Sequence, residues 1–237
     1  MTSLFPPADR PWIAIDFETA DDGRDSACSV ALVRVERGEI VATHSTDIRP
    51  PRETDQYAHI HGLYYCDLRR SPAFCEAWRG VTESKILDGA AAFVAHWAQF
   101  DRSVLHTCSS AFGVAVPRIP FHCSVEMARA AWPDMGSHKL NLMAERLGLE
   151  LKHHDALSDA FACARVTIAA RKILEPEPIA PTAPVGWQIA NVTIGIDAHA
   201  GKLAIRCKRC GSLETFGGKP LDAWLNETVG KHHGCPA

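Results

Sequence analysis

Two acidic residues stand two positions apart in a segment that is typical of a β-strand. Asp16 and Glu18 lie within residues 12–18, where apolar and polar residues alternate and β-forming residues are common. Side chains at positions i and i+2 of a strand leave the same face, about 6–7 Å apart along it. Two carboxylates that close repel one another unless a cation lies between them or one is protonated. The pair therefore predicts a magnesium or manganese site, although acidic pairs at the solvent end of a strand are common.

Two further aspartates fall near the starts of predicted helices. Asp101 follows the short apolar segment 91–95, and Asp159 lies early in the last predicted helix. The structural alternative for Asp101 is a favourable interaction with the helix dipole, as for any first-turn acid. In the last helix, Asp155 is the better candidate for an N-cap. With the strand pair, these positions give four acids for one site.

Three segments that contain these acids resemble, in their order and spacing, the three exonuclease motifs of the DEDDh 3′–5′ exonucleases: AIDFETA, AHWAQFDRSVL and HHDALSDAFACA. This DnaQ-like superfamily includes the replicative proofreading subunit (the DNA polymerase III epsilon subunit), ribonuclease T and oligoribonuclease. The resemblance covers about residues 10–174. It implies a ribonuclease H-like fold, an α/β mixed sheet flanked by helices, and a hydrolase of DNA replication or DNA repair.

The resemblance also implies the metal ligands and the catalytic base. Two Mg²⁺ or Mn²⁺ ions would be held by four carboxylates: Asp16, Glu18, Asp101 and Asp159. Such a pair of ions stabilises the attacking and leaving oxygens of phosphodiester hydrolysis together. The family's histidine, five residues before the last acid, corresponds to His154 rather than to His153. It would take the proton from the attacking water.

Contacts to the 3′-terminal nucleotide are implied by the same resemblance. The segment YAHIHGL, residues 57–63, resembles the loop between the first two motifs. The residues expected to bind substrate are Phe17, Thr19, His61, Gly62, Leu63 and Phe100. Trp97 departs from the pattern, since many relatives have Asn there; the change removes an amide but no metal ligand. It therefore affects the substrate loop rather than the chemistry.

We expect a 3′–5′ exonuclease that acts on single-stranded DNA or RNA ends, with DNA favoured over RNA. The acids contact phosphate and not sugar, so a preference would rest on contacts to the 2′-hydroxyl. One alternative is a nucleic-acid-binding module that has lost catalysis. Another is a proofreading subunit that docks a polymerase or other protein through its C-terminal part.

The end of the chain contains a second group of possible metal ligands. Cys207 and Cys210 form a CxxC followed by Gly211, a shape typical of a zinc knuckle, and a histidine and a cysteine follow near the C-terminus. The predicted set for one structural Zn²⁺ is Cys207, Cys210, His232 and Cys235, with His233 in reserve. A redox CxxC pair is the competing interpretation, but the expected βαβ context is missing.

Strands and helices must position these residues. Residues 12–18, 29–36 and 39–48 predict a three-strand antiparallel meander, and 91–95 predict a short buried strand. Helices are expected from Ser71-Pro72 to about 81, at 100–111, from a Ser137 cap to Gly148, and at 155–173. Strands followed by alternating strands and helices indicate a mixed sheet with helices on both faces.

The chain is expected to have two domains joined by a proline-rich linker. The exonuclease domain would span 1–174, the linker 175–187 and a small zinc-binding domain 188–237; the linker contains Pro176, Pro178, Pro181 and Pro184.

Hydrophobic residues make up 46% of the 237 residues, which argues against disorder throughout. The net charge of −3 does not by itself indicate a nucleic-acid partner. The absence of a long apolar run predicts a cytoplasmic protein without a membrane partner.

Overall fold

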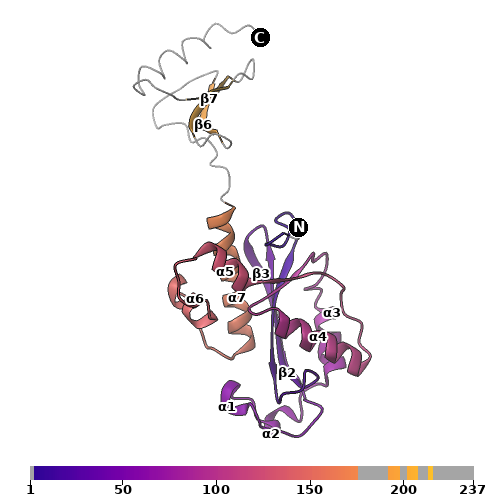
Figure 1. Ribbon diagram of the computed structural model, residues 1–237. Coiled ribbons are helices and arrows are strands. Elements are labelled where there is room, and N and C mark those ends of the chain that lie inside the picture. The colour runs from indigo at the N-terminus through magenta and orange to yellow at the C-terminus, as the bar shows by residue number, and fades with distance from the viewer. Residues whose placement is uncertain (1–2, 176–191, 198–201, 208–212, 216–237) are drawn as a thin grey trace. The chain divides into compact units, whose positions relative to one another are not determined.

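The computed structural model describes residues 3–175 and three strands in the region beyond them, at 192–197, 202–207 and 213–215. The chain divides into two units, Met1–Glu175 and Pro176–Ala237. The first unit contains the mixed sheet and its helices (Figure 1). No helix in the described ranges is long and apolar enough to cross a membrane.

The first unit is built on a five-stranded mixed sheet in the order β3-β2-β1-β4-β5. Its strands are β1 (Trp12–Thr19), β2 (Ala27–Glu36), β3 (Glu39–Asp47), β4 (Phe93–Ala95) and β5 (Phe121–Cys123). The first three pair antiparallel, whereas β4 and β5 run parallel to β1. The predicted meander and the short buried strand are confirmed. Sequence patterns did not predict β5, which has only three residues.

Helices cover both faces of this sheet. On one face lie α3 (Phe74–Glu83) and α4 (Gln99–Phe112); on the other lie α5 (Ser124–Ala131), α6 (Leu140–Leu147) and α7 (Ala156–Leu174) (Figure 1). Two single-turn helices, α1 (Ala58–His61) and α2 (Tyr65–Leu68), lie near one end of the sheet. The arrangement is therefore a mixed sheet between two helical layers, as predicted.

Strand β1 is buried on both faces, and its successive side chains point alternately to one face of the sheet and to the other. Trp12 and Ala14 pack with residues of α5, α6 and α7. Ile13, Ile15 and Phe17 pack with residues of α3 and α4. Because the period is two, the side chains that follow Ala14 on the same face point toward the α7 layer. This alternation places both acids of β1 on the α7 side.

Two helices begin later than their sequence signals predicted. Helix α3 begins at Phe74, with Ala73 as its N-cap, and not at Ser71-Pro72. The carbonyl of Pro72 accepts a hydrogen bond from the N–H of Arg49 at 2.9 Å, so this residue is tied to the segment after β3. Lys139, and not Ser137, is the N-cap of α6. The predicted end of α6 at Gly148 is confirmed by its left-handed φ of 64°.

The second unit contains a three-stranded antiparallel sheet in the order β6-β7-β8. Its strands are β6 (Val192–Asp197), β7 (Lys202–Cys207) and β8 (Leu213–Thr215). Cys207 is the last residue of β7 and pairs with Val192. The other predicted zinc ligands, Cys210, His232 and Cys235, lie outside the described residues.

Candidate active site

Asp16 and Glu18 project from the same face of β1, toward the N-terminal end of α7. Phe17, between them, is buried on the opposite face with a 3% exposed side chain. The ladder of β1 shifts register between Glu18 and Thr19, where the regular pairing with β2 ends. The strand therefore presents two carboxylates at the end of its paired region, and the rigid sheet fixes their separation.

Asp159 reaches the same place from the first turns of α7. The helix begins after Asp155, whose carboxylate accepts a hydrogen bond from the N–H of Ser158 at 3.1 Å, so the predicted N-cap is confirmed. Carboxylate oxygens of Asp16, Glu18 and Asp159 lie within 4.8 Å of one another. Asp159 is only 4% exposed. Two segments that are more than a hundred residues apart thus place three acids at one point.

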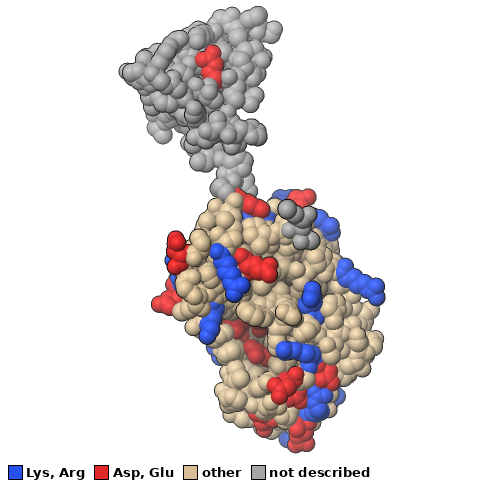
Figure 2. Space-filling view, in the orientation of Figure 1, with Lys and Arg blue, Asp and Glu red and all other residues tan. Residues whose placement is uncertain are grey.

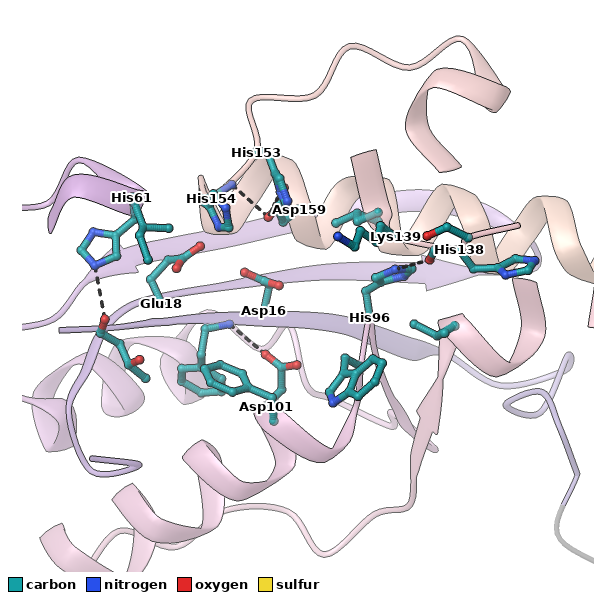
Figure 3. A pocket seen from close by; sticks show the side chains of 18 of the residues that line it. Asp16, Glu18, His61, His96, Asp101, His138, Lys139, His153, His154 and Asp159 are labelled. Atoms are coloured by element: carbon teal, nitrogen blue, oxygen red, sulfur yellow. Dashed lines mark hydrogen bonds and ion pairs between the residues drawn. The ribbon is translucent and has the colours of Figure 1, made fainter. Parts of the chain in front are cut away.

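The fourth acid, Asp101, is attached to the backbone of β1. Its Oδ1 accepts a hydrogen bond from the N–H of Phe17 at 3.0 Å, and its side chain is 2% exposed. Asp101 lies in the first turn of α4, which packs on the sheet face opposite α7. Figure 3 shows its carboxylate below Asp16, on the side away from Asp159. The site therefore draws acids from a strand and from both helical layers.

Without a cation, this cluster is electrostatically unfavourable in its ionised form. Burial, followed by the charges of Asp101, Glu18 and Asp159, raises the pKa of Asp16 well above its usual range. Burial and the charge of Asp159 raise the pKa of Glu18 to about 7. Burial raises the pKa of Asp101 to about 8, although the hydrogen bond from Phe17 opposes this shift. Such acids keep protons near neutral pH unless positive charge is supplied.

The donor set fits a hard divalent cation. Asp159 Oδ2 accepts two hydrogen bonds, but Oδ1 is buried with no hydrogen-bond partner among the described residues. An orphaned buried carboxylate oxygen is costly unless a ligand satisfies it. Carboxylate oxygens at this spacing are the ligands that Mg²⁺ and Mn²⁺ prefer. The residues present can therefore hold a divalent metal.

Two neighbouring histidines approach Asp159 in different ways. The ring Nδ1 of His153 lies 3.0 Å from Asp159 Oδ2, whereas His154 donates to the same oxygen only through its backbone N–H, at 3.1 Å. The two rings stack with centroids 4.0 Å apart. His154 has a left-handed φ of 65°, unusual for a residue with a side chain. Burial, followed by the charge of His153, lowers the pKa of His154, so its ring is neutral at pH 7.

The acids and these histidines line one cavity of about 820 Å³ (Figure 3). Its other lining residues include Tyr57 and Trp97. Figure 2 shows acidic side chains recessed in this face of the molecule, with Lys and Arg side chains on the surface around them. A recess with a negative floor and basic surroundings suits an anionic chain that meets cations at the bottom.

One end of the cavity is formed by His61 (Figure 3). Its Nε2–H donates to the carbonyl of Thr19 at 3.2 Å, and its Nδ1 accepts from the N–H of Leu63 at 3.1 Å. Burial lowers the pKa of His61, which agrees with a neutral ring in this arrangement. Of the residues predicted to bind substrate, Phe17, Thr19, His61 and Phe100 line the cavity. Gly62 and Leu63 do not: Gly62 ends α1, and Leu63 packs against a small apolar cluster.

The opposite end contains residues that sequence analysis did not select, above all His96 (Figure 3). Its Nε2–H donates to the carbonyl of His138 at 2.9 Å, and its Nδ1 lies 2.8 Å from the hydroxyl of Ser124. Burial lowers the pKa of His96 to about 4, so the ring is neutral and Nδ1 accepts. Through its contact with His138, the ring of His96 holds the segment before α6 in place. Lys139, in the same segment, also lines the cavity. The available signal was a polar residue directly after the buried strand β4.

A cavity whose lining includes four carboxylates offers the ligands of the two-metal sites found in nucleases and other hydrolases. Residues 13–167 match the RNase_T family, described as exonuclease. The chain belongs to this exonuclease family, and the predicted enzyme class is confirmed.

Among curated proteins, the chain is similar to the PolC-type DNA polymerase III of Halalkalibacterium halodurans, with 27% identity over 161 residues, or 66% of this chain and 11% of the relative. The enzyme of the same name from Staphylococcus saprophyticus is 29% identical over 168 residues, or 69% of this chain and 12% of the relative. The chain thus corresponds to about a ninth of the length of these polymerases.

Solved structures of nucleases share the fold. Exonuclease X in complex with 5′ overhanging duplex DNA aligns with a TM-score of 0.53 and 25% identity, covering 68% of this chain and 91% of that one. The nuclease domain of 3′hExo, a DEDDh family member bound to rAMP, aligns with a TM-score of 0.53 and 19% identity, over 69% and 91%. Cell-death related nuclease 4 aligns with a TM-score of 0.58 and 16% identity, over 83% and 71%. The fold is the ribonuclease H-like exonuclease fold, as expected.

Proposed function

We propose that this chain is a two-metal 3′–5′ exonuclease that removes nucleotides from single-stranded nucleic acid, DNA in preference to RNA. The observation that carries the proposal is the convergence of Asp16, Glu18 and Asp159 within 4.8 Å, with Asp159 Oδ1 buried and lacking a partner among the described residues. The preference for DNA is supported by relatives whose names or titles mention DNA, Exonuclease X and the PolC-type polymerases.

The acids would hold the metal and thereby the scissile phosphate. Divalent ions bound here would supply charge stabilisation of the phosphoryl and leaving oxygens and a more acidic water. Figure 3 shows the carboxylate of Asp16 between that of Asp159 and that of Asp101, so Asp16 would hold the divalent ions together with these acids and Glu18. Asp101, held by the Phe17 N–H, keeps its second oxygen for this role.

His154 would act as general base. Its ring is neutral at pH 7 and lies at the cavity wall beside Asp159. A neutral imidazole can take a proton from a water molecule that attacks phosphorus. His153 is instead engaged through its ring with Asp159, so we assign it a positioning role.

At the other end of the cavity, Thr19, His61 and Phe100 would hold the 3′-terminal nucleotide. The ring of His61 is fixed by Thr19 and Leu63 and joins α1 to the end of β1. This contact positions α1 against the strand that bears two of the acids. Gly62 and Leu63 would contribute by shaping this segment, since neither lines the cavity.

We also propose that residues 1–174 form the catalytic domain and 188–237 a small zinc domain, joined by the proline-rich linker 175–187. Cys207 at the end of β7 would be one zinc ligand. A segment this small gains order from a structural metal, because its own core is limited.

A second candidate is a proofreading role beside a polymerase. It is favoured by the similarity to PolC-type DNA polymerase III, of which the matched segment is a small part. In that case the second unit would dock a polymerase or other protein. A pull-down with and without residues 188–237 distinguishes this role from independent action.

The direct test is degradation of 3′-labelled and 5′-labelled oligonucleotides, both DNA and RNA, single- and double-stranded. With Mg²⁺ or Mn²⁺, we expect mononucleotides from the 3′ end, faster from single-stranded DNA, and no reaction in EDTA. Faster RNA degradation would reverse the proposed preference. Binding without hydrolysis under every metal condition would contradict the enzymatic proposal and favour a binding module.

A further inference from the structure

A second cavity, of about 570 Å³, lies beside the acidic one. It is formed by β5, by α5 and by the beginning of α4, together with the segment before that helix and the N-terminal residues Ser3 and Leu4. Trp97, Val125 and Arg129 line both cavities, so the two share part of their wall. The catalytic arrangement proposed above does not use this second space.

Trp97 presents an exposed indole where the two cavities meet. Its side chain is 60% exposed, among the most exposed of the large apolar residues described. Its φ of 75° is left-handed, a conformation that is strained for a residue with a bulky side chain. The carbonyl of Trp97 accepts from the N–H of Phe100 at 2.9 Å, which ties this conformation to the start of α4. The chain thus holds a large aromatic surface in solvent instead of packing it.

Two arginines stand beside this indole. Arg102 and Arg129 both line the second cavity and are exposed. Within the part of the chain that the structure describes, neither guanidinium has an ion pair or a hydrogen bond. The wall also contains one carboxylate, that of Glu126. Cations without partners around an exposed aromatic ring are the composition of grooves that bind single-stranded nucleic acid, where bases stack and phosphates meet positive charge.

We propose that this second cavity, which we call the upstream groove, binds the nucleotides on the 5′ side of the scissile phosphate. One base stacks on Trp97, and Arg102 and Arg129 contact phosphates. The proposal rests on the exonuclease function proposed above. Its direction follows from Figure 3, where His61 lies on one side of the acids and His96 and Lys139 on the other. If the 3′-terminal nucleotide occupies the His61 end, the rest of the strand leaves at the opposite end, that of His96, which Trp97 follows directly in the chain.

The test compares a long substrate with one that has no upstream base. We would measure kcat and KM for a ten-nucleotide oligothymidylate and for the methyl ester of thymidine 5′-monophosphate, whose product is separated by chromatography. Trp97→Ala should raise KM for the oligonucleotide about 10-fold, as expected for one lost stacking contact. The ratio of KM for the oligonucleotide to KM for the methyl ester should rise by the same factor. Trp97→Phe, which keeps an aromatic ring, should recover most of the loss.

The contribution of the arginines can be measured independently, from the dependence of KM on salt concentration. In the double variant Arg102→Ala, Arg129→Ala, the dependence of log KM on log salt concentration should become shallower by about 1.4, for two phosphate contacts to a single strand. Glu126→Gln should lower KM for the oligonucleotide, because it removes the negative charge from the wall of the groove. The matched control is the double variant Arg70→Ala, Arg79→Ala, since these exposed arginines line neither cavity. The control should leave the slope unchanged.

The outcomes separate this proposal from the exonuclease itself. If the wild type releases nucleotides but neither set of variants changes KM for the oligonucleotide, the upstream groove is wrong and the exonuclease stands. If the wild type releases none, binding of a 5′-labelled decanucleotide, followed by fluorescence anisotropy, decides instead. Weaker binding by Trp97→Ala then supports the groove, and unchanged binding overturns it.

Discussion

The ring Nδ1 of His153 lies 3.0 Å from Asp159 Oδ2 and occupies one side of a carboxylate whose other oxygen is buried and unpartnered among the described residues. The contact makes the two adjacent histidines inequivalent, although sequence alone presents them as a pair. One ring is engaged with a proposed metal ligand, and the other is available for proton transfer.

This inequivalence yields the first prediction. His154→Ala should lower kcat by about 10²–10⁴-fold, the range for loss of a general base, with metal binding largely kept. His153→Ala should have a much smaller effect, because it removes only a partner of Asp159. Single-turnover kinetics on a labelled oligonucleotide measures both. The opposite order of sensitivity would identify His153 as the base.

Asp16→Ala should abolish hydrolysis, a loss of several orders of magnitude, because it removes the carboxylate that lies between the other acids. The fold should be retained, since repulsion within the cluster is relieved. Release of labelled nucleotides and circular dichroism check the two parts. Asp67→Ala is the control, because this exposed aspartate lies outside the cavity. Full activity of pure Asp16→Ala protein would refute the proposed metal site.

Metal should stabilise the protein most at alkaline pH. The folded-state pKa is about 7 for Glu18 and about 8 for Asp101, well above the usual values near 4. The folded state therefore holds protons that the unfolded state has lost, so stability in EDTA should fall as pH rises from about 4 to about 8. Thermal unfolding should show a larger gain with Mg²⁺ at pH 8 than at pH 5. The double variant Glu18→Gln, Asp101→Asn should reduce this pH dependence. An unchanged slope of stability against pH would show that these two acids do not cause it.

Arg52 binds two aspartates in the loop after β1, a contact that we call the Arg52 clamp. Its guanidinium forms ion pairs with Asp21 at 2.8 Å and Asp25 at 2.7 Å. These contacts lower the pKa of Asp21 to about 2, so the stability they add is present above pH 4 and lost as pH falls toward 2. Arg52→Ala should shift acid unfolding to higher pH and cost under about 1 kcal/mol near neutrality, because the arginine is partly exposed.

The same clamp should affect substrate binding. The segment after Arg52 leads to Tyr57, whose hydroxyl bonds to Asp22 and whose side chain lines the cavity. Arg52→Ala should therefore raise KM several-fold with little change in kcat. Arg52→Lys, which lacks the planar fork, should give a similar though smaller effect. A fall in kcat alone would contradict this positioning role.

Purified protein should contain about one zinc per chain that survives dialysis, if Cys207, Cys210, His232 and Cys235 form the proposed site. Cys207→Ser should release this metal, while cleavage of short oligonucleotides with Mg²⁺ continues. Elemental analysis and the labelled-oligonucleotide assay measure the two effects. Native protein without zinc would contradict the proposed zinc domain.

Sequence patterns predicted most of the sheet, because β1, β2 and β3 are long and rich in β-forming residues. The single-turn helices α1 and α2 and the strand β5 were missed, since elements of three or four residues have no measurable period. The eight-residue helix α5 was missed as well. The N-caps expected at Ser71 and Ser137 were wrong for a tertiary reason. Nearby carbonyls accept hydrogen bonds from Arg49 and His96, and those contacts outweigh the local capping preference.

For the site, motif spacing predicted which acids meet but not how each is held. The tie between Asp101 and the N–H of Phe17 joins residues 84 positions apart, so no local pattern reports it. The left-handed backbone of Trp97 was equally invisible, because bulky residues rarely adopt it. Sequence identified an unusual residue there; only the structure shows that it stands between two cavities.

The proposed metal ligands come from nearly the whole length of the first unit, beginning at Asp16 and ending at Asp159 on α7. A chain still growing on the ribosome cannot assemble this cluster until its last helix has emerged and docked on β1. Chain fragments that end before α7 should lack cutting activity for the same reason. The proposed metal site is thus among the last features of the first unit that synthesis can complete.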